Sequence, residues 1–302
     1  MFKQSSLLVT GGTGSFGRAF VRYALDKLDP HRLVVLSRDE LKQSEMRAEL
    51  NNDPRLRFFI GDIRDRDRLR RAMHNVDFVV HAAALTQVDT AEYNPFEYIK
   101  TNIIGSQHVI EAALDAGVER VIALSTDRAS SPVNLYGATK LAADKLFIAA
   151  NHYASGYDTR FSVVRYGNVM GSRGSVIPFF RDLASRGVPI PVTDTRMTRF
   201  WISLPEAVEF VVKSLEMMNG GELYVPMIPS MKLVDLVRAI APDSELTEIG
   251  IRPGEKLHEE MVSIDDARRT VAVQGRYIIQ PTASSWGYEE PPDAVPVDEG
   301  FC

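Results

Sequence analysis

The sequence predicts an α/β fold, in which a doubly wound parallel sheet is accompanied by a smaller C-terminal lobe. Short apolar runs alternate with helix-like runs from residue 7 to residue 164, as strands and helices do in a parallel sheet. A glycine-rich turn follows the first apolar run, and a long polar stretch follows the fifth. Open sheets of this kind bind ligands at the carboxyl ends of their strands, so the pattern also predicts where the site lies.

Length and composition define the class of protein. The chain has 302 residues, 45% hydrophobic and 25% charged, which is typical of a soluble protein with one large domain and a smaller lobe. Its net charge of -5 provides no basic footprint for nucleic acid. A single cysteine, Cys302, excludes an internal disulfide and indicates a reducing compartment. We find no signal peptide, no apolar run of ~18 residues and no metal-binding motif, and therefore expect a cytoplasmic protein without a membrane segment or a metal.

The first strand, residues 7–9, leads into a glycine-rich turn at residues 10–17 and a helix at residues 18–28. Glycines at 11, 14 and 17 allow a tight turn, close approach of a pyrophosphate and close packing of helix on strand. The helix N-terminus presents its N–H groups to the anion. This order of elements predicts a Rossmann dinucleotide site formed by Thr10, Gly11, Thr13, Gly14, Ser15, Phe16 and Gly17.

The second strand, residues 33–36, ends at the position that distinguishes NAD from NADP. An NAD site usually has an acidic residue there, to hold the ribose 2′-hydroxyl. Here Ser37 and Arg38 occupy the strand end and Lys42 lies one turn later, which suits a 2′-phosphate. The two acidic residues that follow Arg38 argue the other way. We predict NADP as the cofactor.

The third strand, residues 58–60, is followed by Asp62 and Ile63. The Asp62 carboxylate can accept a hydrogen bond from the adenine amino group, or it can cap the next helix, and the sequence leaves both open. After the fourth strand, residues 78–81, three small residues allow the backbone to lie against a dinucleotide, namely Ala82, Ala83 and Ala84. We interpret His81, at the end of that strand, as a packed residue rather than a catalyst.

The fifth strand, residues 121–124, follows a helix at residues 103–116 that ends at Gly117. It stops abruptly in the polar stretch 125–140, where Tyr136 and Lys140 stand four residues apart on one helix face. An ammonium beside a phenol favours the phenolate, so the pair predicts a base that takes a proton from an alcohol. Alone the motif is weak, because two surface residues can share a helix by chance.

The regular alternation of strands and helices ends after the sixth strand, residues 161–164. We assign residues 1–168 and 194–225 to the dinucleotide domain, and residues 169–193 and 226–302 to the substrate lobe. The tail from Thr282 is rich in proline and acid, and we expect it to be loosely ordered.

Two turns of this part of the chain are basic. Residues 195–201 mix arginines with aromatics, which suits a diphosphate and a flat base, and residues 252–256 form a second basic turn. Each turn by itself can also be a solvated charged loop.

The combination resembles a known family. Thr-Gly-x-x-Gly-x-x-Gly, a strand-end Ser-Thr and Tyr-x-x-x-Lys resemble the extended short-chain dehydrogenases that act on nucleotide sugars. Six longer motifs narrow the resemblance to the inverting UDP-N-acetylglucosamine 4,6-dehydratases of pseudaminic-acid type pathways. They are Ser-Arg-Asp-Glu-Leu-Lys-Gln (37–43), Ala-Glu-Tyr-Asn-Pro (91–95), Ser-Pro-Val-Asn-Leu-Tyr-Gly-Ala-Thr-Lys-Leu (131–141), Arg-Tyr-Gly-Asn-Val (165–169), Thr-Asp-Thr-Arg-Met-Thr-Arg-Phe-Trp-Ile (193–202) and Arg-Pro-Gly-Glu-Lys-Leu-His-Glu (252–259).

The resemblance implies an NADP-binding Rossmann domain, a nucleotide-sugar lobe and a homo-oligomer, from dimer to hexamer. It implies that Tyr136, poised by Lys140, takes the proton of the sugar 4-hydroxyl. Thr126 matches the hydroxyl that contacts O4, and Asp127 matches the acid that protonates the departing 6-hydroxyl. The residues expected to bind the UDP-sugar are Thr86, Gln87, Asn168, Val176, Arg196, Arg199, Arg252 and Glu255.

The chain departs from the family pattern at two places. Arg128 stands where the family has the lysine that removes the C5 proton, and a guanidinium does not deprotonate in a protein. Thr86 and Gln87 replace a lysine and a histidine near the substrate. We therefore retain a nucleotide-sugar epimerase or a modified dehydratase as the alternative. A non-catalytic NADP-binding sensor is a third hypothesis, against which the Tyr136–Lys140 pair argues.

Overall fold

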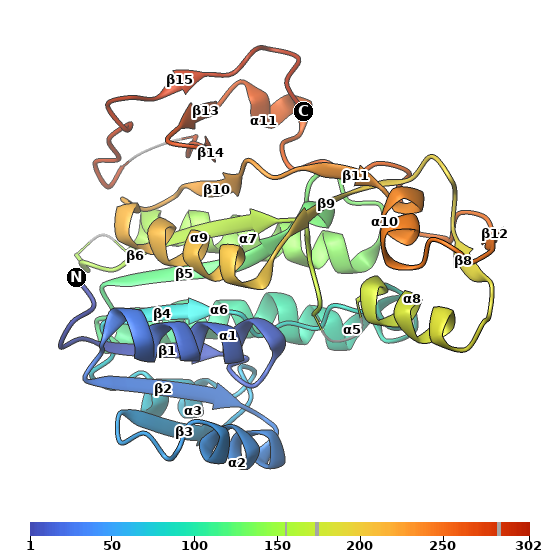
Figure 1. Cartoon of the computed structure of the whole chain (residues 1–302). Coiled ribbons are helices and arrows are strands. Elements are labelled where there is room, and N and C mark those ends of the chain that lie inside the picture. The colour runs from blue at the N-terminus through green and yellow to red at the C-terminus, as the bar shows by residue number, and fades with distance from the viewer. Residues whose placement is uncertain (155, 173–174, 283–284) are drawn as a thin grey trace.

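A computed structural model describes residues 1–154, 156–172, 175–282 and 285–302. Within these residues, ten strands form one sheet in the order β15-β13-β14-β10-β6-β5-β4-β1-β2-β3 (Figure 1). Seven neighbouring strands run parallel, and their order confirms the predicted doubly wound Rossmann sheet. These strands are β1 (Ser6–Thr10), β2 (Arg32–Ser37), β3 (Leu56–Ile60), β4 (Phe78–His81), β5 (Arg120–Thr126), β6 (Arg160–Tyr166) and β10 (Leu223–Pro226).

Helices cover both faces of the sheet (Figure 1). One face carries α1 (Ser15–Tyr23) with its π-helical continuation (Ala24–Leu28), α2 (Glu40–Glu49) and α9 (Leu204–Met217). The other carries α3 (Arg66–Ala72), α6 (Gly105–Ala116) and α7 (Leu135–Tyr153). Gly117 ends α6 with φ at 68°, as its position in the sequence predicts. Shorter helical segments are α4 (Val88–Tyr93), α5 (Pro95–Tyr98), a π-helix (Ile99–Ile104), a 3₁₀ turn (Asp127–Ala129) and α11 (Ile264–Ala267).

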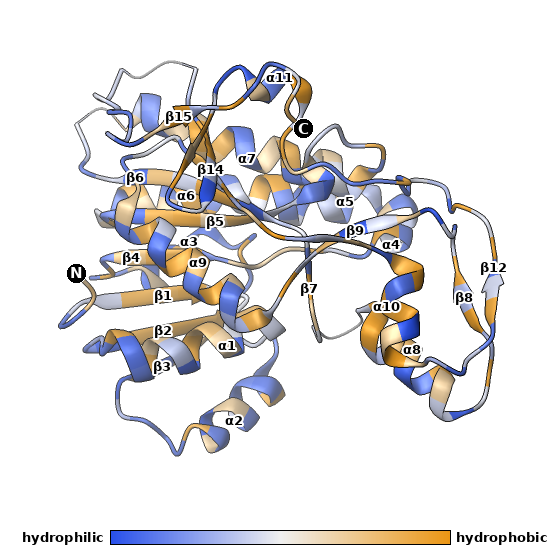
Figure 2. Ribbon diagram, turned by 45° about the horizontal axis from the view of Figure 1, so that its top comes forward, coloured by the Kyte–Doolittle hydropathy of each residue, from blue (hydrophilic) through white to orange (hydrophobic). Residues whose placement is uncertain are grey.

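The strands are apolar on both faces because both faces are covered. Every residue of β1 is buried, and the strands stand out as hydrophobic between helices of mixed polarity (Figure 2). The burial leaves only the strand ends open to ligands, and the carboxyl ends of β1, β4, β5 and β6 all lie at the same edge.

A second apolar core lies in the lobe. It is built from α8 (Val176–Ser185), β8 (Ile190–Val192) and α10 (Leu233–Ile240), and it includes Phe180 and Trp201. Strand β12 (Leu246–Glu248) pairs with β8, while β7 (Asn168–Val169), β9 (Thr198–Ile202) and β11 (Ser230–Lys232) form a small sheet between lobe and domain. In Figure 1 the lobe projects from the sheet beside α5.

The C-terminal segment differs from the predicted division of the chain. Strands β13 (Thr270–Val273), β14 (Arg276–Ile279) and β15 (Val295–Pro296) extend the central sheet as antiparallel strands, although they belong to the range assigned to the lobe. β14 pairs with β10, so its backbone hydrogen bonds hold it to the domain. We therefore place residues 270–296 with the sheet, apart from Ala283 and Ser284, which lie outside the described residues.

The prediction of a loosely ordered tail is wrong for residues 285–302. Trp286 Nε1 donates to the carbonyl oxygen of Gly220 at 3.1 Å, and the ring of Phe301 packs on that of Tyr277 at 4.7 Å. Two aromatic anchors thus order a stretch whose prolines and acids suggested disorder.

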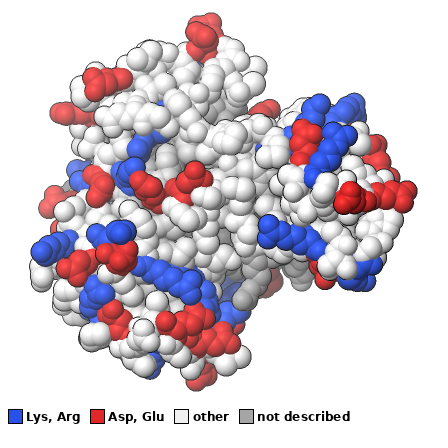
Figure 3. All heavy atoms as spheres, viewed as in Figure 1, with Lys and Arg blue, Asp and Glu red and all other residues white. Residues whose placement is uncertain are grey.

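Among the described residues, no helix is long and apolar enough to span a bilayer. On the face drawn in Figure 3, acidic and basic side chains are interspersed rather than gathered by sign.

Candidate active site

A cavity of about 560 Å³ lies between the carboxyl ends of the parallel strands and the lobe. Its wall includes all five residues predicted to be catalytic, Thr126, Asp127, Arg128, Tyr136 and Lys140. It also includes Ser15, Phe16, Ala82 and Ala84 from the predicted dinucleotide site. The cavity therefore connects the predicted cofactor site with the predicted catalytic residues.

The glycine-rich turn has the shape that a dinucleotide requires. Gly11 has φ at 65°, and a Cβ there would lie 2.9 Å from the Cα of Ala83. A Cβ on Gly17 would lie 2.4 Å from the Cα of Gly12, so only glycine allows α1 to pack this closely. Gly14 is the N-cap of α1, and without a side chain it leaves the approach to the helix N-terminus open. These residues fit a pyrophosphate.

His81 is a packed residue, as the sequence suggests. Its Nδ1 lies 2.8 Å from Thr10 Oγ1 and its Nε2 lies 3.3 Å from Ser106 Oγ. Burial lowers the pKa of His81 to about 3, so the ring is neutral. The Ala83 backbone N–H also donates to Thr10 Oγ1, at 3.2 Å. Thr10 thereby fixes the strand end that lies against the glycine turn.

The two basic residues predicted to hold the 2′-phosphate are already paired with acids. Arg38 Nη1 lies 3.6 Å from Asp62 Oδ2, and Lys42 Nζ lies 2.5 Å from Asp39 Oδ2. Asp62 does not cap α3, because Asp65 is the N-cap of that helix. Instead Asp62 accepts hydrogen bonds from the Arg64 backbone and guanidinium. The Arg38 side chain remains 56% exposed and accessible to a ligand.

Side chains that the sequence predicts to be catalytic are hydrogen bonded to one another at the end of β5. Tyr136 is hydrogen bonded to the side chain of Thr126, and the Thr126 hydroxyl donates to Asp127 Oδ1 at 3.0 Å. Lys140 Nζ donates to the carbonyl oxygen of Leu124 at 2.6 Å. Helix α7 supplies both Tyr136 and Lys140, and Asn134 caps it by accepting from the Gly137 N–H at 2.8 Å.

The charge that acts on Tyr136 differs from the prediction. Burial raises the pKa of Tyr136 to about 12, and the Arg128 guanidinium is the nearby cation that opposes the rise. Lys140, expected to favour the phenolate, is directed to Leu124 O, and burial lowers its own pKa. Removal of water on burial is the main cause of both pKa shifts, and the spacing of two residues in a sequence does not show how deeply they are buried.

Asp127 is 3% exposed, and burial raises the pKa of its carboxyl, while Arg128 and Arg199 oppose the rise. Within the described chain, Asp127 Oδ2 has no hydrogen-bond partner. A buried carboxyl in this setting is suited to carry a proton and to deliver it into the cavity.

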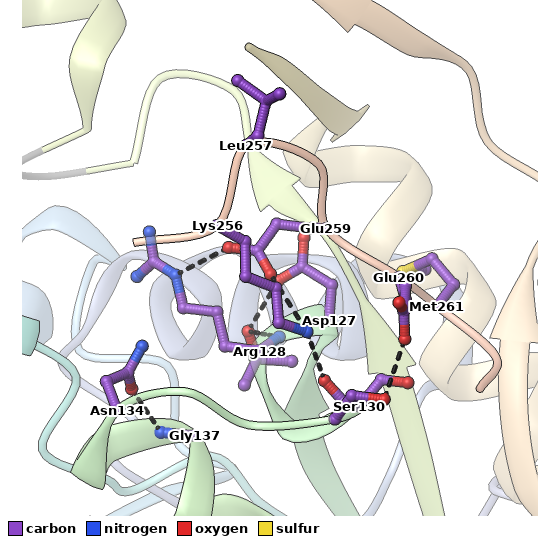
Figure 4. Close-up of polar contacts among 12 residues, drawn as sticks. Asp127, Arg128, Ser130, Asn134, Gly137, Lys256, Leu257, Glu259, Glu260 and Met261 are labelled. Carbon is purple, nitrogen blue, oxygen red and sulfur yellow. Dashed lines mark hydrogen bonds and ion pairs between the residues drawn. The ribbon is translucent and has the colours of Figure 1, made fainter. Parts of the chain in front are cut away.

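The segment 252–261 lies across the loop at residues 127–134 (Figure 4). Arg128 Nε lies 3.7 Å from Glu259 Oε1, and Lys256 Nζ donates to Ser130 O at 2.7 Å. Asn134 Nδ2 donates to Gly254 O, also at 2.7 Å. The turn predicted to bind the substrate diphosphate is therefore attached to the loop that carries the predicted catalytic residues Asp127 and Arg128.

Seven of the eight predicted substrate residues line the cavity, and one does not. Arg196 pairs with Asp194 at 2.8 Å, its side chain is 72% exposed, and the structure does not bring it to the cavity wall. Arg199, three residues later, is 7% exposed and donates to the carbonyl oxygens of Thr198 and Leu257. The seven that line the cavity are Thr86, Gln87, Asn168, Val176, Arg199, Arg252 and Glu255.

Several wall residues were not among the predicted site residues, although Ser125 belongs to the strand-end Ser-Thr and Trp201 to the basic turn 195–201. The lobe contributes an apolar group, and the strand ends contribute two polar residues. Their only sequence signal is position, next to a predicted strand end or within a predicted basic turn. They are Phe179, Phe180, Met197, Trp201, Leu233, Ser125 and Tyr166. Glu259, behind the wall, was missed as a site residue although it ends a quoted motif.

Known proteins are similar to this chain in sequence and in fold. The family model for polysaccharide biosynthesis proteins matches residues 7–281. The chain belongs to this family. Polysaccharide biosynthesis proteins of this type are extended short-chain dehydrogenases, and the predicted resemblance is confirmed.

Two relatives of the chain are enzymes of UDP-sugars that catalyse different reactions. The UDP-N-acetylglucosamine 4,6-dehydratase (inverting) of Campylobacter jejuni is 56% identical over 283 residues, which cover 93% of this chain and 84% of the relative. A UDP-glucose 4-epimerase of Rickettsia rickettsii is 41% identical over 286 residues, covering 92% and 84%.

Two solved structures confirm the fold. Pen from Bacillus thuringiensis superposes with a TM-score of 0.90 and 38% identity, over 93% of this chain and 90% of that one. DesIV, the dTDP-glucose 4,6-dehydratase of Streptomyces venezuelae solved with NAD and TYD bound, has a TM-score of 0.76 and 27% identity, over 87% and 90%.

Proposed function

We propose that the protein is an NADP-dependent 4,6-dehydratase of a UDP-N-acetylhexosamine. It converts UDP-N-acetylglucosamine to a 4-keto-6-deoxy sugar nucleotide, with inversion at C5, for surface-sugar biosynthesis of the pseudaminic-acid type. The observation that carries the proposal is the buried Asp127 carboxyl in the cavity wall, joined through Thr126 to Tyr136. A dehydratase needs an acid at the departing 6-hydroxyl as well as a base at the 4-hydroxyl, and this arrangement supplies both.

NADP would be held by the glycine turn and the ends of β2, β3 and β4. Gly11 and Gly17 leave room for the pyrophosphate, and the exposed Arg38 guanidinium would hold the 2′-phosphate. A bound NADP would supply reversible hydride transfer between its nicotinamide ring and the sugar. DesIV, whose structure holds NAD, supports a nicotinamide dinucleotide in this fold.

The chain's own groups manage the protons. Tyr136 takes the proton of the 4-hydroxyl, and the Arg128 guanidinium stabilises the phenolate against the burial that raises its pKa. Thr126 orients the hydroxyl of Tyr136. Once C4 is a ketone, the C5 hydrogen is acidic, and Asp127 gives a proton to the 6-hydroxyl as it departs.

The C5 base is the open element of this mechanism, because Arg128 remains charged. Three candidates are available: Asp127 in a double role, a bound water, and Asp89, which lies in the cavity wall. Arg128 is suited to hold the negative charge that develops on the C4 oxygen as the C5 proton leaves.

A nucleotide-sugar epimerase is the second candidate. The absence of a lysine at position 128 and the 41% identity to a UDP-glucose 4-epimerase favour it. An epimerase has no use for a protonated carboxyl at C6, which is why we rank it second. The alternative of a non-catalytic sensor leaves Tyr136, Thr126 and Lys140 without a role.

We further propose a cytoplasmic homo-oligomer. Apolar side chains exposed on α4 and α5, Tyr93 at 91% and Phe96 at 58%, support an interface there.

Proton NMR of UDP-N-acetylglucosamine incubated with the protein and NADP⁺ in heavy water tests the function. The proposal expects a new methyl signal, deuterium at C5 and the inverted epimer. A gluco-to-galacto change at C4 without a methyl signal would instead establish the epimerase.

A further inference from the structure

The 3₁₀ turn Asp127–Ala129 carries the proposed acid and the neighbouring guanidinium, and Ser130 closes it. The Ser130 N–H donates to Asp127 O at 3.0 Å. Ser130 is 2% exposed, so its carbonyl oxygen needs a partner within the protein. Lys256 provides that partner. Its Nζ donates to Ser130 O at 2.7 Å, and Figure 4 shows this side chain reaching from the segment 252–261 to the turn.

The backbone directly after Ser130 has an unfavourable conformation. Ser131 has φ at 42°, in the left-handed region that residues with a Cβ rarely adopt. Such a conformation persists only where neighbouring contacts hold it. Ser131 Oγ donates to Glu260 at 2.9 Å, so the segment 252–261 contacts Ser131 as well as Ser130. The segment therefore holds a strained stretch of backbone beside the 3₁₀ turn.

The other side of the turn is packed against α7. A Cβ at Gly137 would lie 2.2 Å from Arg128 O, so the first turn of the helix lies directly on the 3₁₀ turn. The 3₁₀ turn thus lies between α7 and the segment 252–261.

The segment 252–261 is itself anchored to strands of two sheets. Arg199, in β9, donates to the carbonyl oxygen of Lys256 at 3.1 Å. Arg165, in β6, is 2% exposed and donates to Met261 O at 3.1 Å. Because β9 holds the backbone of Lys256, the ammonium of this residue connects the turn to a fixed part of the molecule.

Lys256 does not belong to the cavity wall that the described residues form, although Arg252 and Glu255 of the same segment do. Its side chain is 13% exposed, and its Nζ lies 4.0 Å from Glu259 Oε2, farther than from Ser130 O. Lys256 therefore acts on the site through the turn that it holds, and not by contact with a substrate.

We propose that Lys256 is a positioning residue, which holds the backbone of residues 127–130 so that Asp127 and Arg128 keep their places in the cavity wall. The inference rests on the proposed function for its effect on dehydration, whereas the hold on the turn is a property of the fold. Dehydration needs Asp127 close to the departing 6-hydroxyl, and a displacement of about 1 Å at a reacting group can lower a rate by about 10²-fold. Binding of the substrate at Arg252 needs no such precision.

The first test compares the wild type with Lys256→Met, which removes the ammonium and keeps a side chain of similar length. We expect kcat for dehydration of UDP-N-acetylglucosamine to fall by about 10²-fold with little change in KM, because only the transition state loses an interaction. Arg252→Ala, four residues earlier, should show the opposite pattern. Lys213→Met is the matched control, because that exposed ammonium pairs with Glu209 on α9, and it should change neither constant.

The second test measures the turn itself and needs no substrate. Amide hydrogen exchange, followed by mass spectrometry of the peptide at residues 126–134, reports local opening of the turn, including its Ser130 N–H. We expect exchange about tenfold faster in Lys256→Met, as for the loss of a hydrogen bond to a charged group. Peptides of β1 should exchange as in the wild type, which verifies that the variant is folded. Lys256→Arg retains a cationic donor and should restore both kcat and slow exchange.

Unchanged exchange at residues 126–134 in Lys256→Met overturns the inference, as does a rise in KM without a fall in kcat. Equal impairment of Lys256→Arg and Lys256→Met also contradicts it, because donor and charge would then be present without effect. The exchange measurement separates these failures from a failure of the proposed function. If the wild type forms no methyl group while exchange still rises in Lys256→Met, the hold on the turn stands and the dehydratase proposal fails.

Discussion

Lys256 Nζ donates a hydrogen bond to the carbonyl oxygen of Ser130, 126 residues away in the sequence, at 2.7 Å. Ser131 Oγ donates to Glu260 and Asn134 Nδ2 donates to Gly254 O, so these three hydrogen bonds join residues 128–137 to the segment 252–261. The first segment carries Arg128 and Tyr136, and the second carries Arg252. Arg252 is thereby linked through protein contacts to the segment that carries Arg128.

Tyr136→Phe should fold normally and lose turnover by about 10²–10⁴-fold, because the removed hydroxyl is the proposed general base. Tyr153→Phe, at the other end of α7, removes the same atom far from the cavity and should retain turnover. Rates of NMR-detected product formation decide the matter, and near-normal turnover in Tyr136→Phe would end the assignment.

Arg38→Ala should weaken NADP binding by about 1.5–3 kcal/mol, the value of a charged hydrogen bond, and leave NAD binding nearly unchanged. Arg22→Ala is the control, because that exposed guanidinium pairs with Glu49 instead. Isothermal titration calorimetry measures both. Equal affinity of the wild type for NAD and NADP would contradict the cofactor assignment.

Arg252→Ala should raise the KM for UDP-N-acetylglucosamine far more than it lowers kcat, as expected when binding is lost equally in the ground and transition states. Arg196→Ala offers a sharp comparison, because Arg196 belongs to a similar basic turn but lies outside the cavity, paired with Asp194. Steady-state kinetics should show an unchanged KM for Arg196→Ala. The diphosphate is placed wrongly if the two variants behave alike.

Gly137→Ala should destabilise the protein by about 1–3 kcal/mol, the usual effect of forcing atoms into a packed site. A Cβ at Gly137 would lie 2.2 Å from the carbonyl oxygen of Arg128, which is backbone and cannot move away alone. At Gly300 an added Cβ meets nothing within 4 Å, so Gly300→Ala should be close to neutral. Urea unfolding of both variants gives the comparison, and equal stabilities would refute the packing argument.

Arg128→Lys should keep or increase dehydration of UDP-N-acetylglucosamine, since a lysine can act as the C5 base that arginine cannot provide. Asp127→Asn should abolish dehydration and leave NADP bound, because an amide donates no acidic proton. Methyl-group formation and NADP titration measure the two effects. Destruction of a robust wild-type activity by Arg128→Lys would assign the arginine to a different reaction and move the epimerase to first place.

Much of the cavity wall follows from the sequence, because its residues sit at the ends of strands that the apolar runs define. Thr126 and Asp127 come directly at the end of β5, and Tyr136 and Lys140 share one face of α7. The apolar part of the wall that the lobe contributes, including Phe180 and Leu233, does not follow. Those side chains also look like ordinary core, and only the docking of the lobe turns them toward the cavity.

The sequence by itself determined the doubly wound sheet, the glycine turn and the position of the site. These depend on local chemistry, since alternating apolar runs form covered strands and a glycine lacks the Cβ that would collide. Tertiary structure decided which cations act on which acids. Arg199 faces the cavity while Arg196 does not, Arg128 rather than Lys140 opposes the rise in the Tyr136 pKa, and Glu259 lies beside Asp127. Charge interactions and desolvation depend on distances between segments far apart in the chain, and packing fixes those distances.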